Sequence, residues 1–421
     1  MADPVAETLR RAYPRLVAAL TRGLGDMELA RDAAHEAMAR AVQRWPAYGL
    51  PADPLAWLVT VGRNHGIDHL RRTRREEPLP DGWVELAADD RESEPDAELF
   101  DDDLLRLLFT CCHPALGEVL QITLMLRVVL DFSTQEIAAA LLTSREAIER
   151  RLSRAKLQLR DSGAAWVTPA GEALAQREAT VLRAVYLLFN HGYSLRSDAE
   201  VHRQRLMDQA IHLARVLVRL FVNSGLARAL LALLLLTAAR SDARLDERGG
   251  FVPLDEQDRR CWNWPMIREG RAVLDAVIAA RHPPNGYLIQ AAIASLHDVQ
   301  DGAQTDWLQI AELYSRLAAF DASPAVHINE AVARAHAGDA VRALSMLDTA
   351  NSDSRLKDYQ PLHAARAHVL ARLGRTDDAA EAYAAAIALC DTAPERVWLA
   401  ARAAALSNPV PGVPRSGTGE V

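Results

Sequence analysis

Polar and charged side chains recur along residues 144–160 at positions suited to contact the edges of DNA bases. With a helical period of 3.6 residues, the apolar side chains of this segment fall on one face and the polar ones on the other. The outward-facing candidates are Arg145, Glu149, Arg150, Ser153 and Arg154. An arginine can donate two hydrogen bonds to a guanine edge, and a glutamate can accept one from cytosine. This face therefore predicts base recognition in a DNA major groove.

The residues before this segment predict the second helix that such recognition needs. Ser133 is followed three residues later by Glu136, which is the spacing of a capping box at a helix start. Ser144 is placed to cap the next helix after a short turn. A short helix, a turn and a basic helix make a helix-turn-helix, which places its second helix in the major groove. We therefore predict a helix-turn-helix over residues 132–160.

A second basic segment lies at residues 61–77, where five arginines face three acidic residues. The next stretch, residues 78–103, has the opposite character, with eleven acidic residues, one arginine and a net charge of −10. It also contains three prolines and few residues that could form a core, so a flexible linker is expected. The sequence thus predicts two basic helical domains joined by an acidic linker, although the whole chain has a net charge of −8.

Metal-ligating residue types stand next to one another at Cys111, Cys112 and His113. Adjacent cysteines cannot readily both bind one metal ion, and no second cysteine pair completes a site. We therefore expect buried thiols and no metal site. The sequence contains no glycine-rich phosphate loop, nucleophile elbow or HExxH motif. No catalytic residue and no cofactor are predicted, and the protein is expected not to be an enzyme.

The composition indicates a helical protein of several domains. The length of 421 residues suggests about two to four domains. Alanine, leucine and arginine dominate while aromatic residues make up only 5%, which favours a nearly all-α fold. Of the 48 basic residues 46 are arginine, which we attribute to a GC-rich genome. The N-terminus lacks the apolar core of a signal peptide, and the apolar run at 226–239 is too short to cross a bilayer. We expect a cytoplasmic location and no membrane partner.

The last third of the chain contains an internal repeat. Gly302, Gly338 and Gly374 are spaced 36 residues apart. Small or apolar residues recur at fixed distances from each glycine, namely Ser295, Ala331 and Ala367 before it and Trp307, Ala343, Ala379, Ala311, Leu347 and Tyr383 after it. Small residues allow two antiparallel helices to cross closely, and this pattern resembles tetratricopeptide repeats. The copy around Gly302 is degenerate.

Taken together, these segments resemble the extracytoplasmic-function group of sigma-70-family RNA polymerase sigma factors. The segment LARDAAHEAMARAVQRW (29–45) resembles the polymerase-binding helix of region 2, and PLAWLVTVGRNHGIDHLRRTRR (54–75) resembles its helix for −10 recognition. The helix-turn-helix resembles region 4, which contacts the −35 element. FTCCHPAL (109–116), VYLLFNHGYS (185–194) and HAARAHVLARLGR (363–375) resemble the subgroup with a C-terminal tetratricopeptide extension.

The resemblance implies roles for individual residues. It implies core RNA polymerase binding by Asp32, His35 and Glu36, and contacts with melted −10 DNA by Arg63, Asn64, Arg71, Arg72 and Trp45. It assigns the five residues of the 144–160 face to the −35 duplex. Trp57 lies within an apolar pattern and is expected in the core. The implied partners are core RNA polymerase and promoter DNA, both double-stranded and melted, and a protein or peptide partner at the repeats is left open.

The expected architecture is all-α. Its segments are region 2 (1–77), an acidic linker (78–98), region 4 (99–167), a helical extension domain (168–284), repeats resembling tetratricopeptide repeats (285–406) and a disordered tail (407–421). The expected function is that of an alternative sigma factor whose C-terminal module regulates its activity. One alternative is a helix-turn-helix regulator with a repeat-based sensor, and another is a scaffolding protein. The first alternative would leave the basic and acidic helices of the first domain without a role, and in the second the DNA-like helices would be incidental.

Overall fold

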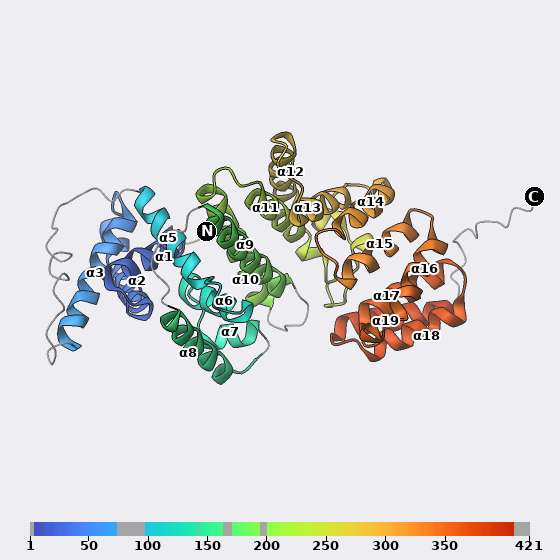
Figure 1. Cartoon of the computed structure of the whole chain (residues 1–421), viewed down its shortest axis with the longest axis horizontal. Coiled ribbons are helices and arrows are strands. Elements are labelled where there is room, and N and C mark those ends of the chain that lie inside the picture. Colours follow the sequence, from blue (N-terminus) through green and yellow to red (C-terminus); the bar gives the residue numbers. More distant parts are fainter. Residues whose placement is uncertain (1–3, 74–96, 142, 163–170, 194–199, 408–421) are drawn as a thin grey trace, which may run out of the picture. The chain divides into compact units, whose positions relative to one another are not determined.

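The computed structural model describes residues 4–73, 97–141, 143–162, 171–193 and 200–407 (Figure 1). Residues 78–96 of the predicted linker, Leu142 in the predicted turn and residues 408–421 of the predicted tail lie outside this described part. The chain divides into two compact units, unit 1 from Met1 to Val222 and unit 2 from Asn223 to Val421. The division falls inside the segment 168–284 that was predicted as one extension domain.

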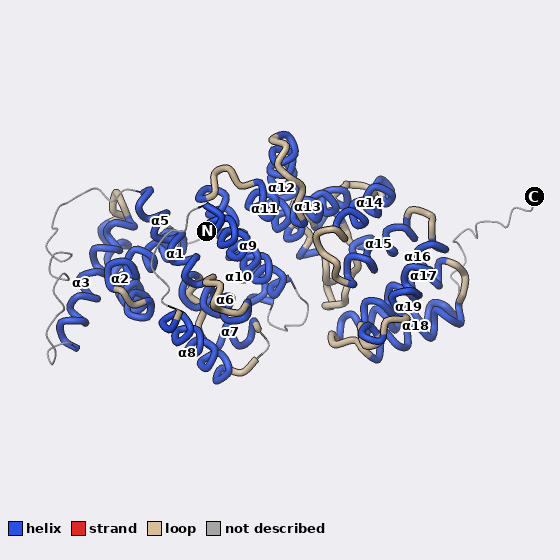
Figure 2. Tube along the Cα trace, viewed as in Figure 1, coloured by secondary structure: helices blue, strands red, loops and turns tan. Residues whose placement is uncertain are grey.

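The predicted all-α fold is confirmed, because the described residues form helices and connections and no strand (Figure 2). One isolated bridge pairs Leu245 with Phe251. The helices of unit 1 are α1 (Pro4–Leu24), α2 (Met27–Tyr48), α3 (Pro54–Thr73), α5 (Ala97–Cys111), α6 (Glu118–Leu124), a π-helical turn (Met125–Val129), α7 (Thr134–Ala140), α8 (Arg145–Asp161), α9 (Gly171–Tyr193) and α10 (Glu200–Leu220).

Small residues let the first three helices of unit 1 pack closely. The inner face of α2 consists of buried alanines, namely Ala30, Ala33, Ala34, Ala37 and Ala41. On α3, a Cβ atom at Gly66 would lie 2.5 Å from Leu24 Cδ1 on α1. The three helices therefore depend on glycine and alanine for their spacing. Asp26 caps α2 by accepting the backbone N–H groups of Glu28 and Leu29.

Unit 2 is a chain of consecutive packed helices. They are α11 (Gly225–Ala238), α12 (Trp264–Ala279), α13 (Gly286–His297), α14 (Trp307–Leu317), α15 (Pro324–His336), α16 (Ala340–Asn351), α17 (Gln360–Arg372), α18 (Thr376–Ala388) and α19 (Ala393–Ser407). The predicted apolar run forms α11, which is buried against α12 and α13. Within the described ranges, no helix combines the length and the apolar character needed to span a bilayer.

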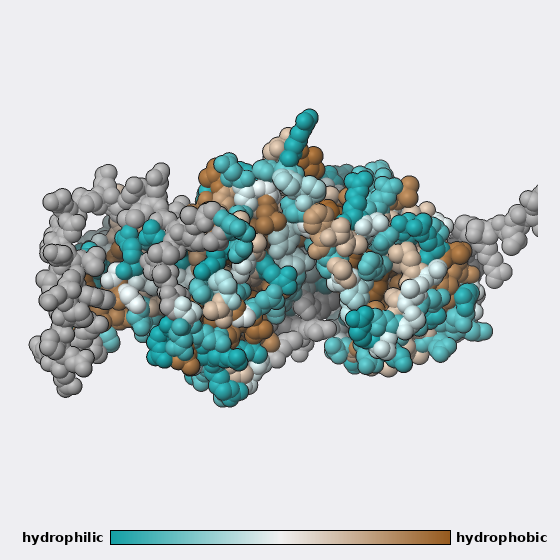
Figure 3. Space-filling model, viewed as in Figure 1, coloured by the Kyte–Doolittle hydropathy of each residue, from teal (hydrophilic) through white to brown (hydrophobic). Residues whose placement is uncertain are grey.

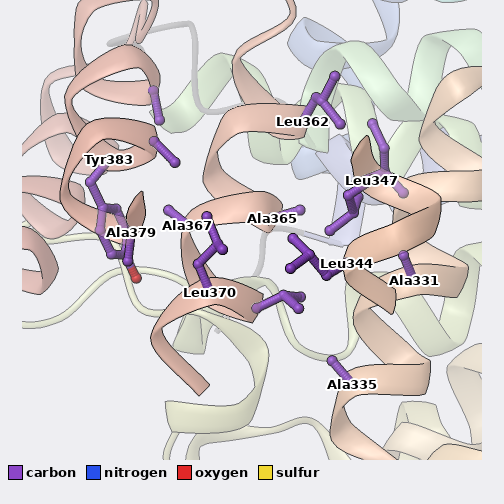
Figure 4. Packing of buried hydrophobic residues seen from close by; sticks show 14 of the residues in the cluster. Ala331, Ala335, Leu344, Leu347, Leu362, Ala365, Ala367, Leu370, Ala379 and Tyr383 are labelled. Atoms are coloured by element: carbon purple, nitrogen blue, oxygen red, sulfur yellow. The ribbon is translucent and has the colours of Figure 1, made fainter. Parts of the chain in front are cut away.

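The positions that define the sequence repeat lie in the core of unit 2. Ala331, Ala343, Ala367 and Ala379 are fully buried, and Leu347 and Tyr383 are buried beside them (Figure 4). Gly338 ends the hairpin turn between α15 and α16 with φ of +98°, and Gly374 does the same between α17 and α18 with φ of +73°. Gly302 differs, because it begins a short 3-10 turn after α13 has ended. This difference accounts for the degenerate first copy of the repeat.

Candidate nucleic-acid interface

The helix-turn-helix forms from the caps that its sequence predicts. At the start of α7, the Ser133 backbone N–H donates to Glu136 Oε2 at 2.8 Å, and the Glu136 N–H donates to Ser133 Oγ at 3.1 Å. This is the reciprocal bonding of a capping box. Ser144 Oγ accepts the Ala147 N–H at 3.2 Å and so begins α8. Both predicted caps are confirmed.

Burial of one face of α8 determines which side chains point outward. Its buried residues are Ile148, Leu152, Ala155 and Leu159, as their helical spacing predicts. The five predicted base-contacting residues are all exposed, and the surface over α8 is hydrophilic (Figure 3). Arg145 Nε lies 2.8 Å from Glu149 Oε1, and Ser153 Oγ donates to the Glu149 carbonyl at 3.0 Å. The structure therefore places the five residues together on one accessible face.

The predicted −10 residues of α3 are also close together. Asn64, Arg71 and Arg72 are exposed, and Arg63 is half-buried. Arg72 Nε donates to the Asp68 carbonyl at 3.2 Å. This bond holds the Arg72 guanidinium group beside the last turn of α3. These residues form a polar and mostly basic surface on α3.

Trp45 does not share that surface. Only 3% of Trp45 is exposed, and its ring meets Trp57 edge-on with centroids 5.5 Å apart. A base can stack only on an accessible ring face, so this burial corrects the prediction that Trp45 contacts melted DNA. Trp57, which was expected in the core, is half-buried.

The three predicted polymerase-binding residues lie on one side of α2 but differ in their surroundings. Asp32 is exposed, with 65% of its side chain accessible, and Oδ1 lies 3.3 Å from the Arg31 guanidinium group. Glu36 is partly exposed and accepts from Arg40 Nε at 2.8 Å. His35 Nε2 lies 2.8 Å from Asp131 Oδ1, which belongs to the connection between the π-helical turn and α7. Part of this face is thus already in contact with another segment of unit 1.

Comparisons with known proteins identify the two helical groups. Residues 8–76 match the family model described as Sigma-70 region 2, and residues 106–159 match the one described as Sigma-70, region 4. The chain thus contains a Sigma-70 region 2 domain and a Sigma-70 region 4 domain. Region 2 accordingly contains α1 to α3, and region 4 ends in the helix-turn-helix of α7 and α8. Residues 177–278 match a further model, described as a family of unknown function (DUF6596).

Individual relatives fall into two groups. An uncharacterized protein of Rhizobium meliloti (strain 1021), R00370, is 42% identical over 393 residues, which is 92% of each chain. A probable ECF RNA polymerase sigma factor, SigI of Mycobacterium tuberculosis, is 27% identical over 179 residues. That match covers 42% of this chain and 61% of SigI, so it spans less than two thirds of that relative. No solved structure matches the chain.

Asp131 connects region 4 to region 2. It has φ of +55°, a left-handed conformation that is uncommon for residues other than glycine, asparagine and aspartate. Its Oδ1 accepts a hydrogen bond from the Tyr13 hydroxyl at 3.1 Å and lies beside His35. The Tyr13 and His35 rings are stacked, with centroids 5.8 Å apart. Burial and the nearby Asp131 carboxylate raise the pKa of Tyr13, so its hydroxyl stays a donor.

A second contact joins the recognition helix to region 2. Lys156 Nζ on α8 lies 3.1 Å from Glu28 Oε1 at the start of α2, and Arg31 pairs with the other carboxylate oxygen of Glu28 at 3.0 Å. Although burial raises the pKa of Glu28, its bonds to Lys156 and Arg31 hold the pKa below the ordinary value. Sequence reasoning missed both contacts, because an acidic residue in a loop and a lysine on a basic helix carry no signal for a specific partner.

Three arginines of α9 and α10 hold these helices against region 4. Arg177 donates to the Phe109 carbonyl at 2.7 Å, and Arg183 Nε lies 2.5 Å from Glu118 Oε1. Arg205 pairs with Glu136, the carboxylate of the capping box. Its guanidinium group also lies over the Phe132 ring, 4.3 Å from the centroid. The first hairpin after region 4 is therefore part of the same compact unit as the helix-turn-helix.

The cysteine pair is structural in this setting. Cys111 and Cys112 are buried, as expected, and Cys112 Sγ lies 3.3 Å from Met125 Sδ. Burial raises the pKa of Cys111 to about 12, so its thiol stays protonated at neutral pH. Among the described residues, no group of histidine, cysteine, aspartate and glutamate side chains has the geometry to bind a metal ion.

Proposed function

We propose that this protein is an alternative sigma factor that binds core RNA polymerase and directs it to a class of promoters. The observation that carries the proposal is the presence of regions 2 and 4 in order, each with a polar, mostly basic helix face open to solvent. Region 4 supplies Arg150 and Arg154 for the −35 duplex, and region 2 supplies Asn64, Arg71 and Arg72 for the −10 element. Asp32, His35 and Glu36 supply the polymerase contacts.

The proposed division of labour follows the predicted segments. Region 2 covers 1–77, the acidic linker 78–98 and region 4 99–167. The extension covers 168–284, and repeats that resemble tetratricopeptide repeats cover 285–406. A linker lets two small domains contact two promoter elements on one DNA molecule, because a flexible chain of about 20 residues can span roughly 25 Å.

The first experiment is DNA protection and transcription with purified full-length protein and bacterial core RNA polymerase. A sigma factor protects promoter DNA only together with polymerase, whereas a helix-turn-helix regulator protects its site alone. The variant Asp32→Arg is expected to weaken polymerase binding, because it reverses one exposed carboxylate of α2. Glu312→Arg, on an exposed position of α14, is the matched control and should bind as the wild type does. DNA protection without polymerase would contradict the proposal.

We also propose that the C-terminal half regulates this activity. A chain ending at Val167 would remove Arg177, Arg183 and Arg205, which hold the helix-turn-helix, so its loss of activity would have a trivial cause. A chain ending at Val222 retains those contacts and removes only unit 2. The expected result is a change in polymerase-dependent transcription between this shorter chain and the full-length protein. Equal activity of the two chains would exclude regulation by unit 2.

A further inference from the structure

The connection between α11 and α12, residues 241–263, is a loop with three short 3-10 turns (Figure 2). It is held by its own hydrogen bonds. At its tip, the Asp246 N–H donates to the Gly250 carbonyl at 2.8 Å, and Asp246 Oδ1 accepts the Gly250 N–H at 2.7 Å. Gly249 has φ of +76°, which favours glycine at this turn. The turn leads directly into Phe251, so the loop presents an aromatic side chain in a defined position.

The loop contacts the last helix of the repeats through an aromatic residue and an acidic residue. The Phe251 ring meets the Trp398 ring of α19 edge-on, with centroids 5.9 Å apart and an interplanar angle of 89°. Glu256 forms an ion pair with Arg402 of the same helix. The Arg402 guanidinium group also lies 5.3 Å from the centroid of the Trp398 ring. Trp398 and Arg402 therefore form one subsite that holds both Phe251 and Glu256.

The same loop contacts one further helix of the repeats and acts electrostatically on two others. Arg259 donates to the His297 carbonyl at the end of α13 at 2.9 Å. The Asp255 carboxylate acts electrostatically on His336 of α15 and His368 of α17. The helices contacted are thus α13 and α19, and the charge of Asp255 acts on α15 and α17. His297, His336, His368 and Arg402 are 39, 32 and 34 residues apart, spacings close to the 36-residue period of the repeat.

Rings of α14, α15 and α17 form a stack. Trp307 stacks on His336 with centroids 4.1 Å apart, and His336 stacks on His368 with centroids 5.2 Å apart. All three side chains are half-buried. His368 Nε2 is buried and has no hydrogen-bond partner among the described residues. A buried ring nitrogen without a partner is costly unless a donor or acceptor reaches it.

We propose that the 241–263 loop is a built-in occupant of the peptide-binding surface of the repeats. Equivalent helices of a repeat array form an extended surface that suits a peptide segment. Here one segment of the chain contacts both α13 and α19. We infer that the partner for this surface is a protein segment with the same chemistry, an aromatic residue followed four and five positions later by two acidic residues, as in Phe251, Asp255 and Glu256.

Competition between the loop and such a partner follows from the tether. A segment joined to its binding surface by a short linker has an effective concentration in the millimolar range. The loop therefore excludes weak free peptides, and a partner binds only when it replaces the contacts of the loop. This inference concerns unit 2 alone, so it does not depend on the proposed sigma-factor activity.

The test uses a fluorescent peptide of residues 249–258 (GGFVPLDEQD) and the full-length protein, without polymerase. The loop variant Phe251→Ala/Glu256→Ala should bind this peptide about tenfold more tightly than the wild type does, since its surface is vacated. A control peptide with alanine in place of Phe251 should bind neither protein. Equal affinity of the peptide for both proteins, or no binding to a folded loop variant, would overturn the proposal.

A second test exchanges the two charges of the Glu256–Arg402 ion pair, and it applies if the loop variant does not fold. Glu256→Arg and Arg402→Glu should each lower the melting temperature, and the double variant should recover most of the loss, because the ion pair is restored in reverse. Additive losses in the double variant would show that the two side chains do not interact, and this result would also overturn the proposal.

Discussion

Two regions of this protein, the α3 and α8 surfaces of unit 1 and the core of unit 2, use arginine in opposite ways. In unit 1, Arg150 and Arg154 of α8 and Arg71 and Arg72 of α3 are exposed. In unit 2, the Arg240 side chain is only 8% accessible and lies 3.4 Å from the fully buried Asp298 carboxylate. The many arginines of this chain therefore do not share one role.

The difference shows why position decides the role of a guanidinium group. Arg271 in unit 2 donates to the carbonyls of Ser295 and Asp298, at 3.0 and 2.7 Å, where α13 ends. These carbonyls would otherwise lack donors at a helix C-terminus. The buried arginines of unit 2 thus stabilise the connections between its helices. The exposed ones in unit 1 are available to phosphates and bases, which supports the proposed DNA contacts.

The largest effect is expected where a buried pair is broken. Arg240→Met removes the ion-pair partner of Asp298 in the core of unit 2, where Arg271 and Arg259 act on the same carboxylate from other positions. Loss of one member of a buried ion pair typically costs about 3–5 kcal/mol in the free energy of unfolding. Urea unfolding followed by tryptophan fluorescence measures this loss. Arg260→Met is the matched control, because Arg260 pairs with Asp258 at the surface, and its unfolding midpoint should not move. Equal midpoints for Arg240→Met and the wild type would contradict the buried role.

The next effect concerns the exposed arginines. Arg150→Ala is expected to lower the affinity of the polymerase complex for its promoter by about 1–3 kcal/mol, roughly 5- to 150-fold, through loss of a base contact. Titration with promoter DNA measures it. Arg160→Ala, which removes an exposed arginine at the far end of α8, should change affinity little. Comparable losses for both variants would mean that α8 binds DNA by charge alone and does not recognise bases.

Much of this arrangement could be predicted because it depends on local rules. The capping residues of α7 and α8, the apolar face of α8 and the small residues at the helix crossings of the repeats all follow from spacing along one or two helices. Their energies come from neighbours three or four residues away, so the sequence alone contains the information. The outward face of α8 followed from the same periodicity.

The features that sequence reasoning missed depend on residues far apart in the chain. Asp131 contacts Tyr13 and His35 across more than 90 residues, and no periodicity links these positions. The burial of Trp45 has the same origin, because Trp57 packs against its ring from another helix. The residues next to Trp45 in the sequence do not indicate this burial. Similarly, the Trp398–Phe251 contact joins a loop to a helix almost 150 residues away. Tertiary packing determined each of these outcomes.

A smaller effect is expected at the contact between regions 2 and 4. Asp131→Asn keeps a residue that tolerates the left-handed backbone but removes the charge beside His35. Loss of one net hydrogen bond, about 0.5–1.5 kcal/mol, should raise the affinity for core polymerase about 2- to 12-fold if this contact competes with polymerase for α2. Sedimentation or fluorescence binding measures the change. Asp161→Asn removes an exposed carboxylate at the end of α8 and serves as control. A lower affinity for Asp131→Asn would show instead that the contact supports the binding conformation.

The smallest effect is the pH dependence that the buried side chains of unit 2 give to its stability. Burial lowers the pKa of His297 to about 3, with Arg240, Arg259 and His336 adding to the shift. Burial also lowers the pKa of His336 to about 4, with His368 and Arg372 adding to it and Asp255 opposing it.

In the unfolded chain these imidazoles bind protons near pH 6.5, but in the folded protein they do so only at lower pH. The folded state therefore loses stability relative to the unfolded state as the pH falls from 6.5 towards 4. Asp298 opposes this trend, since burial raises its pKa to about 6 and its protonation then favours the folded state. Burial lowers the pKa of His368 as well, so three histidines against one carboxyl group give a net fall in the melting temperature of unit 2 between pH 7 and pH 5. His336→Gln should make the fall in melting temperature with pH less steep, without lowering the melting temperature at pH 5. An unchanged slope would mean that folding does not lower the pKa of His336.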